Sequence, residues 1–421
     1  MADPHKPAAH PSPDVPNPDT DAYAQESELE AHLQAKPMYI NMGPSHPATH
    51  GTVRLKLLLE GETISDADCE IGFLHRGFQK SCENVTWTQC LPYTDRLNYA
   101  SPLMNNFGFL TAVEKLIGLE IPERAQYVRV IGAELHRIHD HLTCVAATSM
   151  ELGGFAPFLF GMEARELIND RVAELTGARL TTSFGRVGGL NRDLPEGWIA
   201  KTLKSLDKIR ELADECESLL SRNRIFVDRM KGTGVISAED ALDYGWTGPC
   251  LRACGIDYDL RKARPYWVYD QLDFDVPVGE KGDNYDRYLM RIEEMKQSDH
   301  ILRQALARIP DGPIIVDDWR IALPPKPEVY GTIEGVISHF KLVMEGIQVP
   351  PGEVYDATES ANGELGWYIV SDGGGRPYKV HVRAPGFPIL SAMPSIVKGG
   401  LLADLIPTFD TINMIGGEVE Q

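Results

Sequence analysis

Two histidines four residues apart mark the segment MGPSHPATHG, residues 42–51. On a helix, His46 and His50 would share one face and form a metal-binding pair. Pro47 disfavours helical backbone at His46, and the segment holds no cysteine or carboxylate to complete a ligand set. These residue types therefore favour hydrogen-bonded turn histidines, with a substrate-binding loop as an alternative and a metal pair as a weaker one.

A second group of histidines lies in HRIHDHL, residues 136–142. His136 and His139 leave the apolar stripe of the surrounding helical pattern, whereas His141 follows Glu134 by seven residues along one edge of that stripe. A glutamate and a histidine inside a helix bundle can build a carboxylate metal site. Because the chain lacks a clear second Glu-x-x-His, a buried ion-pair or hydrogen-bond network is the favoured interpretation.

A tyrosine suited to a carbonyl ligand lies in YTDRLNYAS. If this stretch is helical, Arg96 and Tyr99 face the same way. A tyrosine ring can line an apolar slot while its hydroxyl donates one bond to a quinone or another carbonyl. Taken alone, Tyr99 also fits the edge of a core. The stretch GFLHRGFQK adds His75 and Arg76.

The glycine-rich stretches and the cysteines do not fit a nucleotide or metal site. DGGG, residues 372–375, precedes a strand pattern and is typical of a turn, and KGTGVIS, residues 231–237, lacks the third glycine of a dinucleotide loop. The seven cysteines form no C-x-x-C, and the closest pair is Cys250 and Cys254. This spacing disfavours zinc, iron–sulfur and disulfide frameworks and indicates buried, reduced thiols of a cytosolic protein.

The composition excludes other classes. A chain of 421 residues predicts one large or two fused domains, and its 43% hydrophobic content is ordinary for a globular protein. A net charge of −20 disfavours binding to nucleic acids or anionic membranes. No stretch approaches the ~18 apolar residues of a membrane span. Residues 1–36 are rich in proline and acids without an apolar signal core, which predicts a solvated tail, with one helical turn at Glu26–Leu33, and no secretion.

The elements that position these residues follow from periodicity. Apolar residues alternate over residues 53–59 and resume at Ile64, which predicts a β-hairpin directly after the histidine loop. Spacings of three and four between Val128 and Val145 predict a long bundle helix with Pro122 in its first turn. Near the C-terminus, WYIVSDGGGRPYKVHVRAP predicts strand, turn and strand. We expect further helices over residues 101–118, 163–175, 199–220 and 285–306, with Ser101 and Asp283 as N-caps and Gly177 as a C-cap.

Several motifs in series resemble the D-subunit family of respiratory complex I, NADH:quinone oxidoreductase. The resemblance runs from about Met38 to the C-terminus, in order and without large gaps. It rests on MGPSHPATHGTVRL, IGFLHRGFQK, YTDRLNY, AVEKLIG, GPCLRACGIDYDLRKARPY, DRYLMRIEEMKQS, GELGWYIVSDGG and YKVHVRAP.

The resemblance implies an α+β fold like that of nickel–iron hydrogenase large subunits. It predicts a disordered tail at 1–36, a β region with the quinone-site loop at 37–75, a helical bundle core at 76–346, and a C-terminal hairpin and tail at 347–421. The hydrogenases carry two C-x-x-C motifs for their metal centre, and this chain has none. We therefore expect an organic ligand where the metal was, with no metal and no covalently bound cofactor.

The family's site residues map onto this sequence as follows. His50 and Tyr99 would hydrogen-bond and protonate the quinone headgroup. The electrons would come from an iron–sulfur cluster in a neighbouring subunit, and Arg76 would lie near that cluster and raise its potential, unless it is a plain surface arginine. The substrate-binding set would be His46, Thr49 and Arg76, and the proton network Glu151, His141, Arg137 and Glu134.

Three positions depart from the family pattern. Glu151 stands where an aspartate commonly pairs with the loop histidine, and Asn98 replaces an aspartate before the tyrosine. Thr181 stands about where many members place a histidine beside the cluster, which favours a low-potential quinone such as menaquinone over ubiquinone.

The sequence therefore predicts the quinone-site subunit of a proton-pumping NADH:quinone oxidoreductase. It would be a peripheral protein on the cytoplasmic side of the bacterial inner membrane, bound to the cluster-carrying neighbour and to other subunits of the peripheral and membrane arms. The alternatives are a non-catalytic scaffold subunit with the old site closed, and the large subunit of a related membrane-bound hydrogenase. The electron donor, NADH or ferredoxin, and the pump stoichiometry stay open.

Overall fold

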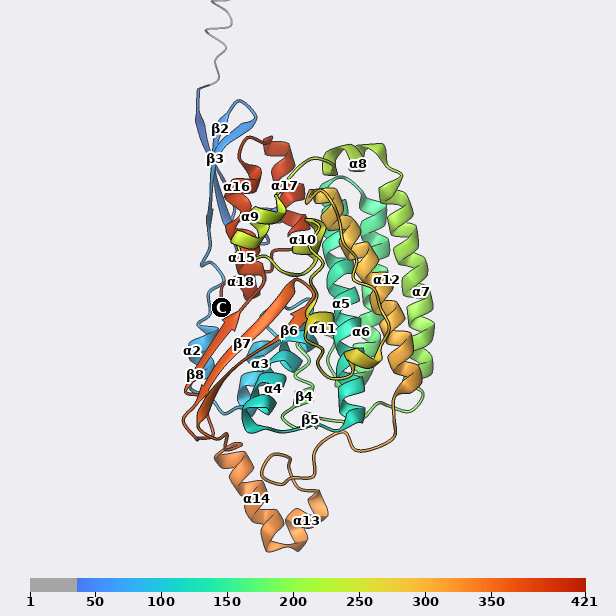
Figure 1. Ribbon diagram of the computed structural model, residues 1–421, viewed down its shortest axis with the longest axis vertical. Coiled ribbons are helices and arrows are strands. Elements are labelled where there is room, and N and C mark those ends of the chain that lie inside the picture. Colours follow the sequence, from blue (N-terminus) through green and yellow to red (C-terminus); the bar gives the residue numbers. More distant parts are fainter. Residues whose placement is uncertain (1–35) are drawn as a thin grey trace, which may run out of the picture.

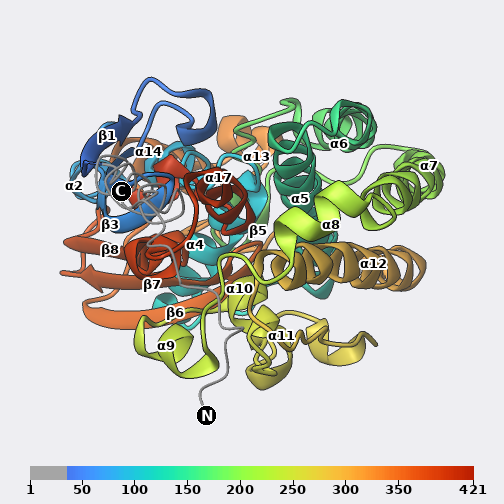
Figure 2. The same cartoon turned by 90° about the horizontal axis from the view of Figure 1, so that it is seen from above.

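The computed structural model describes residues 36–421, so the tail expected at 1–36 and the helical turn at Glu26–Leu33 lie outside the described residues apart from Lys36. The expected α+β class is confirmed: a helix bundle lies beside small antiparallel sheets (Figure 1). Seen from above, the bundle helices group on one side and the sheets on the other (Figure 2).

The N-terminal sheet follows the predicted alternation. Strands β2 (Arg54–Glu60) and β3 (Thr63–Glu70) form the expected hairpin, and β1 (Met38–Met42) adds a third antiparallel strand on the far side of β2. Leu55 and Leu57 turn into a core shared with the C-terminal helices. That packing joins the first ordered strands to the end of the chain.

Four long helices form the bundle. α5 (Glu123–Glu151) packs against α6 (Phe155–Thr176) and α12 (Asn284–Arg308), while α7 (Trp198–Ser221) packs against α6 and α12. The predicted apolar stripe of α5 is buried. α6 begins eight residues earlier than expected from sequence, because its first turns leave Phe155 and other apolar residues exposed and show no buried face.

The predicted helix ends are mostly correct. Asp283 accepts a hydrogen bond from the Asp286 amide at 2.8 Å, and Gly177 ends α6 with a φ of 88°. Ser101 does precede α4 (Pro102–Ile117), but its hydroxyl makes no capping hydrogen bond. The expectation for Pro122 is wrong by one position, since this residue is the N-cap of α5.

The C-terminal sheet supports α4. Strands β6 (Gly352–Ser360), β7 (Gly363–Ser371) and β8 (Lys379–Arg383) run antiparallel, and the glycine-rich stretch after β7 is the expected turn. α4 packs on β6 and β7 and also contacts α5. The sheet therefore braces the bundle on the side that carries YTDRLNYAS.

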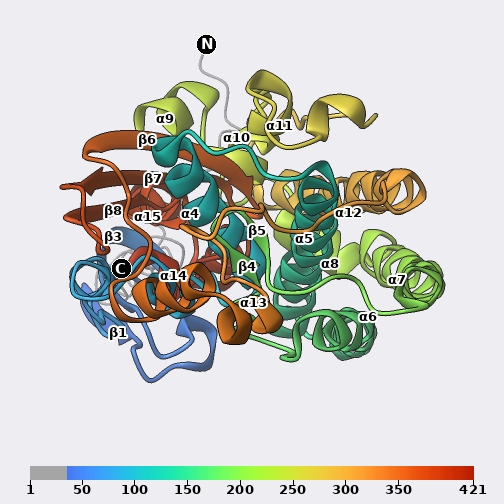
Figure 3. The same ribbon diagram turned by 90° about the horizontal axis from the view of Figure 1, so that it is seen from below.

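The remaining elements are short. Two of them, α13 and α14, project from the foot of the molecule, away from the N-terminal sheet (Figures 1 and 3). Across residues 36–421, no helix combines the length and apolar character needed to cross a bilayer. The short elements are η1 (Pro47–Thr49), α2 (Phe78–Cys82), η2 (Thr88–Cys90), α3 (Leu91–Thr94), β4 (Gly185–Arg186), β5 (Gly189–Leu190), α8 (Arg224–Met230), α9 (Ala238–Asp243), α10 (Gly248–Ala253), α11 (Leu260–Ala263), η3 (Tyr269–Gln271), α13 (Lys326–Gly331), α14 (Ile333–Met344), α15 (Gly386–Ser391), α16 (Met393–Val397), α17 (Leu402–Thr411) and α18 (Gly416–Val419).

A buried ionic network holds α5 to its neighbours. The Glu134 carboxylate lies 3.2 Å from Arg137 and 3.1 Å from Arg261, and it accepts hydrogen bonds from the Tyr269 and Ser298 hydroxyls. Burial alone would raise the pKa of Glu134, but the two guanidinium groups outweigh it and lower that pKa to about 2. Glu134 is therefore an ionised anchor near neutral pH.

The network continues through the bundle with balanced charge. Arg252 pairs with Glu294, Glu359 and Asp259, so desolvated cations and anions alternate. The hydrogen-bond network expected around HRIHDHL is therefore confirmed. Its charged members are the arginines Arg137, Arg252, Arg261 and Arg291 and the acids Glu134, Asp259, Glu294 and Glu359.

Glu134→Gln removes the central charge of this network and keeps its shape. We expect a loss of about 3–5 kcal/mol in the free energy of unfolding, because two buried guanidinium groups lose their counter-charge. The matched control is Glu293→Gln on α12, whose ion pair with Lys296 is on the surface and contributes less than about 1 kcal/mol. Chemical unfolding of the chain measures both. Equal, small losses would contradict the anchoring role of Glu134.

Candidate functional site

The histidine loop is folded tightly by its own polar groups. The Ala48 amide donates to the His46 imidazole at 3.2 Å, so His46 caps η1 as a turn histidine. Thr49 is fully buried, and its hydroxyl lies 3.2 Å and 3.1 Å from the carbonyls of Pro44 and His46. Only glycine fits at Gly43, where a Cβ would lie 2.2 Å from the Val53 carbonyl oxygen. These contacts give His46 and Thr49 a loop-shaping role.

His50 is presented at the end of this loop. Its backbone is left-handed, with a φ of 54°, and its exposed ring lies 6.5 Å from the ring of Phe409. Burial of the imidazole nitrogens lowers the pKa of His50, and the charge of Glu151 partly opposes that shift. Within residues 36–421, no three His, Cys, Asp or Glu side chains gather closely enough to hold a metal ion.

Tyr99 lies on a turn. The backbone after α3 is non-helical through residues 95–101, so the conditional expectation that Arg96 and Tyr99 share a helix face is wrong. The Tyr99 side chain is 38% exposed. Burial raises the pKa of its phenol, Asp140 raises that pKa further, and Arg76 opposes both. Arg76 is held nearby by a 2.7 Å hydrogen bond that it donates to the Arg96 carbonyl.

Asp140 is a residue of this site that the sequence reasoning missed. It is fully buried on α5, where one carboxylate oxygen accepts from Asn98 at 2.8 Å and the other accepts from Asn413 at 2.6 Å. Asn98 directly precedes Tyr99. The Asp140 carboxylate therefore fixes the backbone that presents the phenol, using a partner from the far end of the chain.

One side of α5 connects the two candidate groups. Asp140 and Glu151 are eleven residues apart, which is about three helical turns and about 16 Å along the axis. Side chains at that spacing point to the same side of a helix. Tyr99 interacts with Asp140 and His50 with Glu151, so the two groups lie along one edge of α5.

The C-terminal segment, residues 409–421, lines this edge. Phe409 faces His50, and a Cβ at Gly417 would lie 2.5 Å from the Arg96 carbonyl oxygen. Further on, Glu420 accepts from the Leu74 amide, and its carbonyl lies 3.0 Å from His75. The two adjacent glycines near the chain end are the only sequence signal of this close packing.

The interior members of the predicted proton network lie deeper. His141 lies 2.8 Å from Glu294 and 3.2 Å from Arg291, and burial lowers its pKa despite the Glu294 carboxylate. The Arg291 guanidinium lies 3.4 Å from Asn362, whose oxygen accepts from Asn413 at 2.7 Å. A continuous line of polar contacts therefore joins the ionic network to Asp140.

Thr181 lies in a strained loop beside the tyrosine motif. Its φ is 48°, and Ser183 two residues later has a φ of 42°. The Ser183 amide donates to the Asp95 carboxylate at 2.6 Å, which ties this loop to the residue before Arg96. Burial raises the pKa of Asp95 to about 6 against the effect of these hydrogen bonds.

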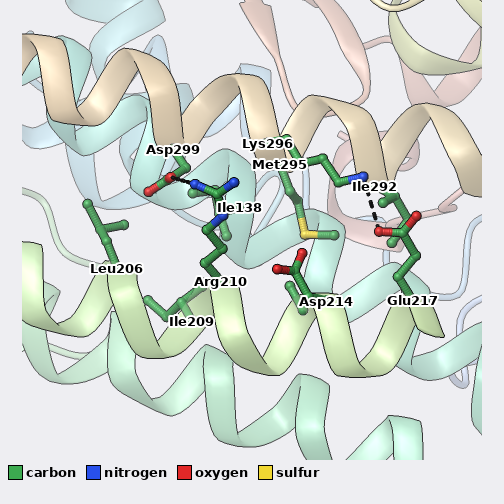
Figure 4. A pocket seen from close by; sticks show the side chains of 11 residues that line it. Ile138, Leu206, Ile209, Arg210, Asp214, Glu217, Ile292, Met295, Lys296 and Asp299 are labelled. Atoms are coloured by element: carbon green, nitrogen blue, oxygen red, sulfur yellow. Dashed lines mark ion pairs between the residues drawn. The ribbon is translucent and has the colours of Figure 1, made fainter. Parts of the chain in front are cut away.

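One cavity lies elsewhere, between α5, α7 and α12 (Figure 4). Ile138 and Ile292 contribute apolar walls, and the Lys296–Glu217 ion pair of 3.1 Å closes its rim. Neither His50 nor Tyr99 lines it. Because both of these side chains are exposed in the single chain, a ligand between them would be enclosed only with a neighbouring chain in place.

The comparisons with known proteins decide the family. Residues 151–421 match the family described as respiratory-chain NADH dehydrogenase, 49 Kd subunit. The chain belongs to this family. It is 80% identical to the D subunit of the NADH-quinone oxidoreductase of Myxococcus xanthus (strain DK1622), over 97% of this chain and 99% of the relative. It is 63% identical to a D subunit, the second of its kind, of the same enzyme in Anaeromyxobacter sp. (strain Fw109-5), over 94% and 92%.

A third relative joins two subunits in one chain. The fused C/D subunit of the NADH-quinone oxidoreductase of Bdellovibrio bacteriovorus (strain HD100) is 49% identical over 92% of this chain and 70% of the relative. The chain therefore resembles D subunits both where these stand alone and where they are part of a C/D fusion.

Membership of the 49 kDa family removes the ground for the hydrogenase alternative. All seven cysteines are free, and six are buried. In the closest pair, the Cys254 thiol contacts the Cys250 carbonyl at 3.4 Å. Burial raises the pKa of both thiols, so neither is a ready thiolate ligand. The prediction of buried, reduced thiols is confirmed.

The structure explains one departure from the family pattern. Asn98 donates its amide to Asp140, whereas an aspartate at this position would place two carboxylates against each other. Glu151 lies near enough to His50 to act on its charge, but among the described residues no hydrogen bond joins the two. The effect of Thr181 on a neighbouring cluster stays a prediction.

Asn98→Asp is expected to destabilise the region around Tyr99 by about 1–3 kcal/mol, since a buried hydrogen bond becomes a like-charge contact. The exchange Asn98→Asp with Asp140→Asn returns an amide donor to the pair and should recover most of that loss. Thermal denaturation of the assembled enzyme measures both. If the double variant is no better than Asn98→Asp alone, the pairing does not govern this position.

Proposed function

We propose that this chain is the quinone-site subunit in the peripheral arm of a proton-pumping NADH:quinone oxidoreductase. The observation that carries the proposal is the placement of an imidazole and a phenol along one edge of α5, each beside a carboxylate of that helix. His50 and Tyr99 are the groups that would contact the quinone headgroup. Family membership supports this assignment.

The two groups suit the chemistry. Reduction of a quinone to a quinol takes two electrons and two protons, and negative charge develops on its oxygens. The raised pKa of Tyr99 keeps its phenol protonated at neutral pH, so it can donate a hydrogen bond and then a proton. His50 can donate from its ring once the oxygen beside it becomes strongly basic. Both must then be reprotonated from the protein.

The electrons would come from an iron–sulfur cluster of a neighbouring subunit. Tyr99 and Arg76 are exposed on the same part of the surface, where a second chain would complete the quinone chamber. Arg76 would bring positive charge to that interface and so raise the potential of a nearby cluster. This chain itself would bind quinone as a substrate and no cofactor of its own.

The other predicted site residues take different roles. His46 and Thr49 hold the loop that presents His50, and Glu151 tunes the His50 pKa. Arg137 and the ionised Glu134 anchor the network, and His141 connects it towards Asp140. In this arrangement the interior residues supply a polar route, and Glu134 supplies charge balance without releasing protons.

The proposal extends to partners and location. The chain would dock on the cluster-carrying neighbour and on other proteins of both arms, as a peripheral protein on the cytoplasmic side of the bacterial inner membrane. Thr181 in place of a histidine favours menaquinone over ubiquinone. The competing scaffold interpretation predicts that His50 and Tyr99 can be replaced without effect on quinone reduction.

Tyr99→Phe removes the phenolic hydroxyl and keeps the ring. We expect NADH:quinone reductase activity in membranes to fall by about tenfold or more, because the lost donor stabilised the transition state by about 1.4 kcal/mol. The matched control is Tyr93→Phe, since Tyr93 belongs to the same motif and is also 38% exposed.

NADH:ferricyanide activity, which bypasses the quinone site, reports whether the upstream enzyme persists. Retained quinone reduction in Tyr99→Phe would favour the scaffold interpretation. Equal losses in the Tyr99 and Tyr93 variants would also argue against a specific role for Tyr99. Loss of ferricyanide activity as well would indicate failed assembly, and His50→Ala then provides the same test from the other side of the site.

A further inference from the structure

A buried carboxylate that no part of the proposed mechanism uses lies on α17. Asp410 is 6% exposed, and neither of its carboxylate oxygens has a hydrogen-bond partner or contact with solvent. Such groups are rare in folded proteins and costly when charged. The residue before it, Phe409, faces the ring of His50. Asp410 is therefore an unpaired acid immediately behind the histidine loop.

The charged groups around α17 do not compensate Asp410. From α12, Arg287 donates to the Thr411 hydroxyl at 3.2 Å and Arg291 donates to the Thr411 carbonyl at 3.3 Å. From α8, Arg229 pairs with Asp404 at 3.5 Å. All three nearby cations are directed to other acceptors.

The face of α5 opposite Asp410 adds no positive charge either. The Cys144 thiol contacts the Asp410 carbonyl at 3.3 Å, and burial raises the pKa of that thiol to about 12, so it is neutral. The other acidic neighbour is Glu151. Burial and then the charge of Glu151 raise the pKa of Asp410 to about 8. At neutral pH Asp410 is therefore predominantly a neutral carboxylic acid.

Glu151 is the neighbour that Asp410 and His50 share. Its charge acts on the imidazole from one side and on the Asp410 carboxyl group from the other. Two acids placed together can hold one proton between them, because ionising both is unfavourable. The order Asp410, Glu151, His50 therefore leads from a buried proton to the edge of the site.

We propose that Asp410 is the proton store of this site, whose proton passes through Glu151 to His50 after His50 has protonated the reduced quinone. The O–H bond of Asp410 breaks and one forms on Glu151, which then gives its proton to the imidazole and returns to a carboxylate. Asp410 is left as a carboxylate until solvent reprotonates it. The electrons for the quinone come from the neighbouring iron–sulfur cluster, so this inference rests on the proposed function.

The test is Asp410→Asn in the complete enzyme, assayed in membranes between about pH 6 and pH 10. Asparagine matches the neutral acid in shape and polarity but has no proton to release. In the wild type we expect quinone reduction to decline above about pH 8, as Asp410 loses its proton before turnover. In the variant we expect the rate at pH 7 to fall by roughly tenfold or more, without that decline.

Two further variants make the result specific. Asp404→Asn is the matched control, because Asp404 lies on the same helix with its carboxylate paired to Arg229, and its pH profile should equal that of the wild type. Asp410→Glu keeps a carboxylic acid and should recover much of the rate. A wild-type rate in Asp410→Asn at pH 7 would overturn the proposal, since it would show that neutrality alone is needed.

The remaining outcomes also decide. If Asp410→Asn fails to assemble, judged by ferricyanide activity and by the amount of this chain in the membranes, Asp410→Ser carries the same test with a smaller side chain. If neither assembles, the wild-type profile decides, because a rate that does not fall between about pH 7 and pH 9 excludes Asp410 as the store. His50→Ala separates the two ideas: full quinone reduction in that variant removes the proposed site itself, whereas its loss beside a normal Asp410→Asn removes only the store.

Discussion

The carboxylate of Glu134 lies in the middle of the bundle with no access to water, and it remains ionised because Arg137 and Arg261 lie within about 3 Å of it. Removing such a charge from its partners costs several kcal/mol, so the elements that carry the partners cannot separate independently. The network ties α5 to α11, α12 and the end of β6. The position of α5 along its axis is thereby determined more narrowly than apolar packing alone would require.

That fixed helix is the reference for the candidate site. Asp140 and Glu151 project from one side of α5, and loops from other parts of the chain are brought to them. Asn98 and Asn413 approach Asp140 from segments 315 residues apart in sequence, and the histidine loop approaches Glu151. Loops positioned by a rigid scaffold are the usual location of catalytic groups. Here the scaffold acts through hydrogen-bonded carboxylates, which set direction as well as distance.

Local patterns in the sequence were sufficient for much of this architecture. Periodicity predicted α5 and the β2–β3 hairpin, and the chemistry of single residues predicted the Asp283 and Gly177 caps. The start of α6 was missed because its first turns have no buried face. The resemblance supplied His50 and Tyr99, but neither spacing nor composition pointed to the contact between Asp140 and Asn413, because such a pair forms only when distant segments are packed together.

Glu134 and Asp410 show why burial alone does not predict the role of an acid. Both are removed from water, yet the pKa of Glu134 lies near 2 and that of Asp410 near 8. The difference is the neighbour: two guanidinium groups in one case and a second carboxylate in the other. An acid held ionised over the whole physiological range gives stability and exchanges no protons. An acid whose pKa lies just above neutrality exchanges them readily. Because the arginines of α12 reach Thr411 and stop short of Asp410, the boundary between these two behaviours falls within a single turn of α17, directly behind His50.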